Sequence, residues 1–481
     1  MSVGSVSNAL SGLSGYDFSG IVDSLVSVYK IPESAMVASQ AKVQTTSDAW
    51  KDVNTRMAAL EATLTGLSDS STWTSTKAST SNSSIVSATT GISAVKGSYD
   101  IHVDNIAKTQ TVASASQGVA SGTTATAVTA GIFNITIGLV DTPISVKANS
   151  SLQDIADSIN NSKIGVSASV IKVNDGYKIA INSTKTGLAN AASYADTLGG
   201  TSLSDLGIVN LGTLNETQQA KDASLTINGV TGVSSASNTI TSAILGVTLN
   251  ISGADVLPDT VTTINVTADT SVPQAKIQGF IDQYNSTMSF IETKMSYDSA
   301  TKTAGDLFGD QTLQGIQEHL RNMVSGSFGT TGKYSILSSI GITTSSANFG
   351  KDASLTLDSA KFAAAMTDDP DSIANMFGAP AGGVTPSKDA VSGQGVANIL
   401  ENYLHPMLMF GGSFANRQSG YTTQIADYKT RITDFEAKAT TYQATQKAKF
   451  AALETALSAI TAQGTSLTSM LKSLDAQTTT K

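Results

Sequence analysis

The chain of 481 residues contains no cysteine, which excludes disulfide bonds, thiolate nucleophiles and zinc sites of the usual cysteine type. Charged residues make up only 14% of the chain, against a usual fraction of about a quarter. Serine, threonine, asparagine and glycine take their place, so we expect a neutral, hydroxyl-rich surface. The net charge of -9 and the pI near 4.9 offer no basic surface for nucleic acid or anionic lipid, and neither is an expected partner.

Long apolar runs are also absent. The nearest, LHPMLMF from Leu404, is broken by His405 and Pro406, whereas a membrane-spanning helix needs about 20 apolar residues. We therefore expect no membrane insertion. The first basic residue is Lys30 and no unbroken apolar core precedes it, so a conventional signal peptide is not expected and any export would use another route. The length itself favours two to four domains.

The first 70 or so residues have a helical pattern with one interruption. Ile21, Leu25 and Val28 fall on one face of a first helix. Pro32 blocks its continuation, so a second helix is expected to begin near Glu33.

The second helix carries the seven-residue repeat of a coiled coil. Ser39 and Thr46 occupy positions offset by three from the repeat in its first half, which indicates looser packing there. The expected seam residues are Met36, Val43, Trp50, Met57 and Leu64.

The last sixty or so residues carry the strongest repeat, with apolar residues stepping by four and three. One helix from Tyr421 to Leu474 would be about 80 Å long, and it needs the N-terminal helix, neighbouring subunits or both to cover its apolar stripe. The aromatic members of the repeat are therefore interpreted as seam residues. The expected seam comprises Tyr421, Ile425, Tyr428, Ile432, Phe435, Tyr442, Phe450, Leu453, Leu457, Ile460, Leu467, Leu471 and Leu474.

Between about Trp73 and Val272 the apolar period changes to two, which is typical of half-buried strands. Tyr99, Ile101 and Val103, for example, alternate with polar residues. Similar alternations begin at Phe133, Val166, Tyr177 and Val247.

Local signals refine this outline. Residues 174–176, Asn-Asp-Gly, predict a hairpin turn, and Ser151 is placed to cap a helix inserted among the strands. Helical pattern returns near Pro273, and a further helix is expected around DQTLQGIQEHLRNMV from Asp310. A short β passage and another helix are expected between 350 and 370.

Together these patterns predict an α+β, multidomain fold: a terminal α-helical coiled-coil stalk with an inserted β-rich head of two small domains. The expected segments are 1–73 for the N-terminal stalk helices, 74–105 with 221–272 for the adjoining head domain, 106–220 for the outer head domain, 273–420 for a helical domain with short β elements, and 421–481 for the C-terminal coiled-coil helix.

No constellation of residues predicts catalysis. His102, His319 and His405 lie in different expected elements, the last in a turn before Pro406, and no partners converge on them. The acidic run around Pro370 lacks a calcium loop and is better suited to helix capping. We therefore expect no catalytic, cofactor-binding or metal-binding residues, no cofactor and no enzymatic activity.

Several stretches resemble, in order, the flagellar hook-associated protein 2 family, also called the filament cap family. The similar passages are SGLSGYDFSGIVDSLV from Ser11, GIFNITIG from Gly131, SLQDIADSIN from Ser151, DASLTINGVTGVSSASNTITSAILGVTLNI from Asp222, FIDQYN from Phe280, LFGDQTLQGIQEHLR from Leu307, SSIGITTSS from Ser338, and SLTLDSAKF with DDPDSIANMF.

This resemblance implies a secreted, extracellular homo-oligomer at the distal end of the bacterial flagellar filament, most often pentameric in the family, with four to six subunits considered. Its implied partners are flagellin, the hook-filament junction proteins and, before secretion, an export chaperone. Its implied role is ordered insertion and folding of flagellin, with secondary adhesion to host surfaces.

Three other readings remain open from the sequence alone. The first is an adhesin whose head, residues 74–272, binds mucin or another host ligand. The second is a junction protein or a flagellin relative with the same terminal helices. The third, a secreted enzyme with its site in the head, has no catalytic cluster to support it.

Overall fold

The structure is a computed structural model that describes residues 18–197, 200–257, 260–328, 332–345, 354–378 and 395–478. The outermost residues of the two expected terminal segments, 1–17 and 479–481, lie outside these ranges. The chain forms two compact units. We call Met1–Ser70 with Gln274–Lys481 the helical unit, and Ser71–Pro273 the β-rich unit. The expected α+β multidomain fold, with helical termini and a β-rich insertion, is confirmed.

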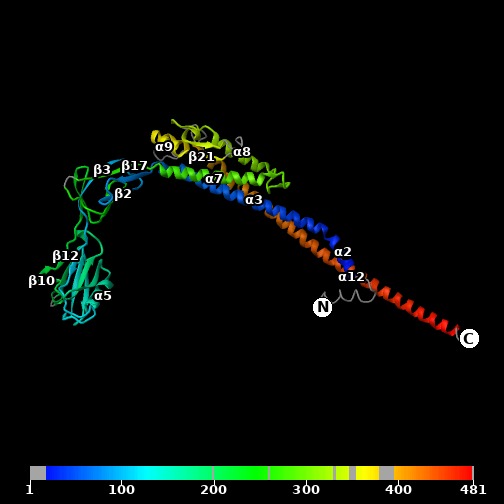
Figure 1. Cartoon of the computed structure of the whole chain (residues 1–481), viewed down its shortest axis with the longest axis horizontal. Helices are drawn as coiled ribbons and strands as arrows, with labels where there is room; N and C mark the ends of the chain where they lie inside the picture. Colours follow the sequence, from blue (N-terminus) through cyan, green and yellow to red (C-terminus); the bar gives the residue numbers. More distant parts are fainter. Residues whose placement is uncertain are drawn as a thin grey trace. The chain divides into compact units, whose positions relative to one another are not determined.

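The helical unit is organised around two long helices, visible in blue and orange in Figure 1. Helix α3 (Ile31–Ser68) has 38 residues and α12 (Ser413–Thr478) has 66. Helix α2 (Phe18–Tyr29) precedes α3 and also packs on α12. Helix α3 begins two residues before the expected Glu33, because a proline in the first helical turn lacks only an N–H that has no partner there anyway.

Shorter elements surround the C-terminal half of α3. These elements are α7 (Ser271–Met295), α8 (Gln311–Ser325), α9 (Ser359–Asp368), α10 (Pro370–Phe377), α11 (Val396–Leu408), the 3-10 helix η2 (Leu337–Ile340), and the paired strands β18 (Tyr297–Asp298) with β19 (Thr303–Ala304) and β20 (Ile342–Thr344) with β21 (Leu355–Leu357). Helix α4 (Ser70–Trp73) leads from α3 into the β-rich unit. Helix α11 packs on α3, α8 and α12, and α7 lies along α3, where Arg56 donates to the Ser286 hydroxyl at 2.7 Å.

Two helix starts agree with the sequence, and the course of one helix differs from it. Asp310 caps α8, and Asp369 caps α10 with Pro370 in the first turn, so the acidic run around Pro370 does cap a helix. His405, expected in a turn, instead lies inside α11. A proline in the last helical turn removes one hydrogen bond without preventing that turn from forming, so the helix continues past Pro406 to Leu408.

The β-rich unit has two hydrophobic cores. We call the first the inner lobe: a five-stranded sheet, β1-β17-β3-β13-β14, and a three-stranded sheet, β15-β16-β2, all antiparallel. Ile101 and Val103 are fully buried in this core, as their alternation predicted. The strands are β1 (Thr76–Thr80), β2 (Val86–Thr90), β3 (Gly97–Asn105), β13 (Ala223–Ile227), β14 (Val230–Ser235), β15 (Thr239–Ile244), β16 (Val247–Ile251) and β17 (Thr262–Ala268).

The second core belongs to what we call the outer lobe. It contains the sheets β12-β4-β8-β7 and β6-β5-β9 and the separate hairpin β10-β11. Its elements are β4 (Thr111–Ala113), β5 (Gly131–Ile137), β6 (Val140–Val146), α5 (Leu152–Ser162), β7 (Val166–Val173), β8 (Gly176–Ser183), η1 (Leu188–Asn190), β9 (Ala192–Asp196), α6 (Ser202–Asp205), β10 (Val209–Asn210), β11 (Thr213–Leu214) and β12 (Glu216–Gln218).

Two local predictions in this lobe are confirmed. Val173 pairs with Gly176, so the chain turns at Asn174 and Asp175 as a two-residue hairpin. Ser151 caps α5, and its hydroxyl and backbone exchange hydrogen bonds with Asp154 in a capping box. The apolar face of α5 packs against β7 and closes the core.

Candidate assembly interface

Helices α3 and α12 form an antiparallel pair within the helical unit. The Gln418 side chain donates to the Ser47 hydroxyl at 2.8 Å, and Gln40 donates to the Ile425 carbonyl oxygen at 3.5 Å. A step of seven residues along α3 therefore matches a step of seven back along α12. This is the register that two heptad seams require in order to face each other.

Asp310 connects this pair to a third helix. One carboxylate oxygen accepts the amides of Thr312 and Leu313, at 3.0 and 3.2 Å, and thereby caps α8. The other oxygen accepts the Trp50 indole N–H at 3.1 Å and an Arg417 guanidinium N–H at 2.7 Å. Each oxygen thus serves a different task, and one side chain joins α3, α8 and α12.

Trp50 is the apolar counterpart of this junction. It is only 3% exposed, with the Arg417 guanidinium 4.2 Å from its ring and the Phe414 ring 5.7 Å away. A guanidinium at this distance from an indole ring is attracted to its electron-rich face. Charge, hydrogen bond and ring packing together fix the first turns of α12 against the middle of α3.

Aromatic rings join α2 to α12 further along. Tyr29 stacks on Tyr442 with ring centroids 4.4 Å apart and on Phe435 at 5.4 Å. Phe18 lies 5.6 Å from Phe450. Such offset contacts contribute about 0.5–1.5 kcal/mol beyond the burial of area. The antiparallel arrangement of α3 and α12 thus extends to α2.

The predicted seam residues differ greatly in exposure. Trp50, Met57 and Leu64 are buried, in the half of α3 that other helices surround. Half-buried seam residues are Met36, Val43, Tyr421, Ile425, Tyr428, Ile432, Phe435, Tyr442, Phe450 and Leu457. Exposed seam residues are Leu453, Ile460, Leu467, Leu471 and Leu474.

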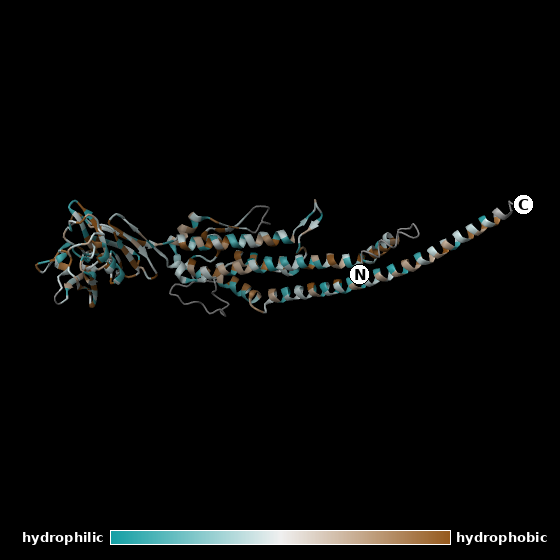
Figure 2. Ribbon diagram, turned by 90° about the horizontal axis from the view of Figure 1, so that it is seen from below, coloured by the Kyte–Doolittle hydropathy of each residue, from teal (hydrophilic) through white to brown (hydrophobic). Residues whose placement is uncertain are grey.

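The last part of α12 carries most of the exposed apolar side chains of this helix. Leu467, Met470 and Leu471 are each at least 60% exposed. In both views this end of the helix runs beyond the other described helices of its unit (Figure 2). Within the described chain, its heptad stripe therefore continues past the region where α2 and α3 cover it.

Helix α2 shows a second exposed face. Ile21, Leu25 and Val28, which the sequence places on one side, are 46%, 38% and 65% exposed, whereas Phe18 and Val22 are buried. The apolar residues of this helix thus fall on two sides, and one of them faces away from α12.

Sequence reasoning missed several contact residues. Phe18 and Tyr29 precede the heptad region, so the repeat gives no sign of them. Phe414 and Arg417 lie before the expected start of the C-terminal helix at Tyr421, and Gly420, a weak helix former, stands between, yet α12 runs through it. Asp310 was expected only near the start of a helix, because its second role depends on tertiary structure.

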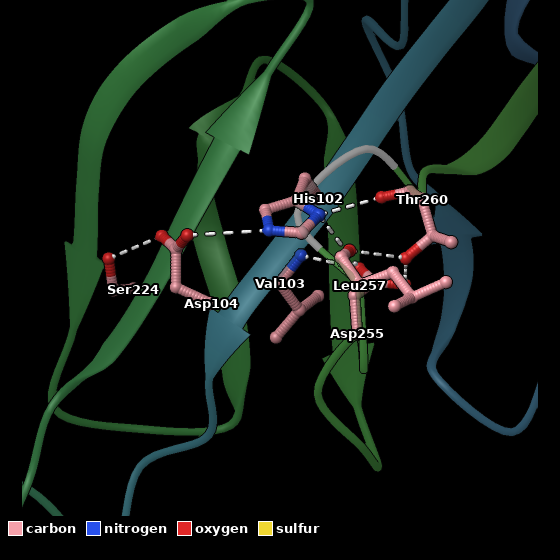
Figure 3. A network of polar contacts seen from close by, with 7 residues as sticks. All are labelled: His102, Val103, Asp104, Ser224, Asp255, Leu257 and Thr260. Atoms are coloured by element: carbon pink, nitrogen blue, oxygen red, sulfur yellow. Dashed lines mark hydrogen bonds and ion pairs between the residues drawn. The ribbon is translucent and has the colours of Figure 1, made fainter.

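A polar network surrounds His102 in the inner lobe (Figure 3). Its Nδ1 lies 2.6 Å from the Thr260 carbonyl oxygen, a geometry in which Nδ1–H donates. Carboxylate oxygens of Asp104 and Asp255 each lie 3.5 Å from a ring nitrogen. The imidazole thus attaches β3 to the segment that leads into β17.

This network contains serine, histidine and aspartate but lacks the geometry of a nucleophilic triad. The Ser224 hydroxyl donates to Asp104 at 2.8 Å, whereas an activated serine must donate to the imidazole. The other two histidines also have local partners, since His405 contacts Glu61 at 2.8 Å and the His319 ring lies 5.2 Å from that of Tyr403. Across the described ranges, no cluster of acidic and histidine side chains could hold a metal ion.

The described helices include none with the length and apolarity needed to cross a bilayer. The fold and the exposed α12 stripe place the chain among α+β proteins in which helices from the two ends of the chain pair antiparallel. Comparison with known proteins then gives the family. The profile described as flagellar hook-associated protein 2 C-terminus matches residues 220–462, its N-terminal counterpart matches 14–110, and the flagellin hook IN motif matches 133–185. The chain belongs to the flagellar hook-associated protein 2 family.

Individual relatives agree with this assignment. Flagellar hook-associated protein 2 of Escherichia coli is 31% identical over 372 residues, spanning 74% of this chain and 77% of that protein. The B-type protein of Pseudomonas aeruginosa is 27% identical over 388 residues, spanning 76% and 79%. The crystal structure of the D1-D2-D3 domains of the flagellar cap protein FliD from Escherichia coli superposes with a TM-score of 0.60 at 28% identity, covering 78% of this chain and 99% of that one.

Proposed function

We propose that this protein is a structural cap at the distal end of the bacterial flagellar filament, where it promotes the ordered insertion and folding of flagellin. It would act outside the cell after export, as a homo-oligomer of four to six subunits, most simply five. Flagellin, the hook-filament junction proteins and an export chaperone would be its partners. Family membership supports the location, and the apolar stripe on α12 supports assembly.

In this proposal residues 1–73 and 421–481 form the coiled-coil leg, with 273–420 beside it. Residues 74–105 with 221–272 form one head domain, and 106–220 form the other. The residues that would make subunit contacts are the exposed members of the predicted seam.

The observation that carries the proposal is the exposed end of α12. Leu467, Leu471 and Leu474 recur at heptad spacing and are 60%, 61% and 63% exposed. Burying one such side chain stabilises a complex by about 1.5–3 kcal/mol, so a row of them favours contact with neighbouring helices. Flagellin folding and packing would supply the energy for assembly, and no nucleotide or metal would be needed.

A matched pair of variants tests this assignment. Leu467→Asp places a charge in the stripe, and Thr465→Asp places the same charge on the opposite, hydroxyl-bearing side of the same helical turns. Both sites are exposed, so the fold of the single chain should tolerate either change. We expect Leu467→Asp to lower the oligomer mass in sedimentation and to release unpolymerised flagellin from cells that lack their own cap. Thr465→Asp should behave as wild type.

The proposal fails if the wild-type chain stays monomeric at every concentration and does not restore filaments to such cells. Equal behaviour of Leu467→Asp and Thr465→Asp would instead remove only the role of the stripe.

A further inference from the structure

Strand β7 lies at the edge of the outer-lobe sheet β12-β4-β8-β7, so another strand pairs with it on one side only. Its hairpin with β8 closes at the pair Val173 and Gly176, and from there hydrogen-bonded and non-hydrogen-bonded pairs alternate. The N–H and C=O groups of Ala168, Val170 and Lys172 therefore point away from β8. Within the described chain, those of Val170 and Lys172 have no hydrogen-bond partner.

This edge lacks the features that protect the other edge strands in the three-, four- and five-stranded sheets of the β-rich unit. Strand β6 contains Pro143, and register shifts interrupt the pairing of β12, β14 and β15. Strands β1, β2 and β9 are five residues long. Strand β7 has eight residues, without proline or glycine, and pairs with β8 without a register shift. A long, regular edge is a template to which a strand of another chain can add.

Asn160 of α5 occupies the place of a neighbouring strand at this edge. Its side-chain amide accepts the Ala168 N–H at 2.8 Å and donates to the Ala168 carbonyl oxygen at 2.9 Å. A primary amide offers both a donor and an acceptor, so it satisfies both outward groups of one residue. The helical unit uses the same arrangement at β21, where Asn285 of α7 makes the same two bonds to Leu355, at 2.6 and 2.8 Å.

We propose that Asn160 prevents the β7 edge from pairing with the β7 edge of a second copy of this chain. Without Asn160, two antiparallel β7 strands aligned at Val170 would place Ala168 opposite Lys172, and each of these residues would exchange hydrogen bonds with its counterpart. With Asn160 in place, the outward groups of Ala168 are already bonded, and the amide fills the space of the added strand. A second copy is the partner because it presents the same outward groups at the same spacing.

Side chains alone would not prevent this pairing. In the aligned strands, Ser169 lies opposite Ile171 on the exposed face of the sheet. Each Lys172 lies opposite Ala168, so the two lysines do not face each other directly. The blocking role of Asn160 goes beyond the proposed cap function and does not depend on it. A homo-oligomer that holds several heads together raises their effective concentration, which makes an open edge more hazardous.

Hydrogen exchange in the wild-type chain gives the first test. Resolved to single residues, it should show the Ala168 amide protected and the Val170 and Lys172 amides exchanging at least tenfold faster. Equal protection of all three amides would show that another group already covers the edge, and would overturn the proposal.

The absence of cysteine permits a second test in the full-length protein. Ile171→Cys, at a side chain that is 47% exposed, is treated with a short bis-maleimide and should give little covalent dimer. Adding Asn160→Ala should raise the dimer yield at least tenfold. Asn161→Ala, at the exposed neighbouring position of α5, is the matched control and should leave the yield unchanged.

Lys172→Pro distinguishes strand pairing from a general loss of stability. The Lys172 N–H points away from β8, so a proline there removes no hydrogen bond within the sheet but opposes an added strand. Combined with Ile171→Cys and Asn160→Ala, it should return the dimer yield to that of Ile171→Cys alone. If Asn160→Ala leaves the yield unchanged, or if the triple variant still cross-links, the blocking role is wrong, whether or not the cap proposal holds.

Discussion

Tyr29 and Tyr442 stack almost in parallel, with their ring centroids 4.4 Å apart and an interplanar angle of 8°. They lie 413 positions apart in the sequence, the difference between their two numbers. This pair, with Phe435, is the main described attachment of the end of α2 to α12.

Tyr29→Ala should loosen α2 from α12 without unfolding the rest of the helical unit. Losing the two ring contacts alone costs at least about 1 kcal/mol, which raises the opening equilibrium at least about fivefold. Amide hydrogen exchange in residues 18–29 should therefore become faster by at least that factor. The neighbouring Val28→Ala, at a side chain that is 65% exposed, should change exchange little. Equal effects of the two variants would show that the stack does not hold the helix.

Asp310→Ala should destabilise the helical unit more than the loss of a helix cap alone. It removes the cap of α8 and leaves the Trp50 and Arg417 donors unpaired, at a cost of about 2–4 kcal/mol in unfolding free energy. Denaturant unfolding followed by Trp50 fluorescence, in a Trp73→Phe background that removes the second of the two tryptophans, would measure this cost.

The matched control for this variant is Asp358→Ala. Asp358 caps α9 by accepting the amides of Ala360 and Lys361, each at 3.0 Å, and its removal should cost about 1 kcal/mol. A cost for Asp310→Ala no greater than for Asp358→Ala would contradict a joining role for Asp310.

The capping box of α5 should make stability depend on pH in the acid range. The Ser151 hydroxyl and then the Ser151 backbone amide donate to Asp154 and hold the pKa of its carboxyl below the usual 3.8. A lowered folded-state pKa means that the stabilisation is complete above pH 3.8 and is lost as the pH falls through the folded value.

Asp154→Asn, which does not titrate, provides the comparison. Its melting temperature should lie below that of wild type at neutral pH, and the gap should shrink as the pH falls below 3.8. A gap that stays constant down to the most acidic pH at which the protein folds would contradict the ionised capping box.

Gly187 is a position in the β-rich unit where a methyl group should be poorly tolerated. Its φ is 96°, and an added Cβ would lie 2.4 Å from the Cβ and 2.6 Å from the Cα of Ala236. Gly187→Ala should cost about 3 kcal/mol through strain and overpacking, measured as a drop in melting temperature. Gly229→Ala, at φ 80° with nothing within 4 Å, has the backbone strain without the overpacking and should cost about 1 kcal/mol. If the two variants lost similar amounts of stability, the loop at Ala236 would have moved to make room for the added methyl group.

The parts of the fold that the sequence predicted are those governed by local rules. Alternation at Ile101 and Val103 identified a buried strand face, and Ser151 and Asp369 marked helix starts, because period and capping depend on neighbours in the chain. The family resemblance was also confirmed, because it rests on passages whose residues and order are read directly along the chain.

What the sequence could not supply depends on which elements meet. Asp310 was placed near a helix start, but its bonds to Trp50 and Arg417 need three helices brought together. His405 was expected in a turn because Pro406 follows, yet the helix continues past both. Heptad spacing likewise marked Leu467 and Leu471 as seam residues but could not tell whether the protein's own helices cover them. The assembly role of the whole predicted seam stays a prediction.

The contact between Phe18 and Phe450 has a mechanical consequence. Helix α12 continues for about 42 Å beyond Phe450 at 1.5 Å per residue, so this contact is the fulcrum of a lever. A bend of about 10° there would move the far end by roughly 7 Å, more than one helical turn of 5.4 Å. Any partner that grips the tip of this helix therefore has considerable leverage over Phe18, Tyr29 and the short helix α2 that carries them.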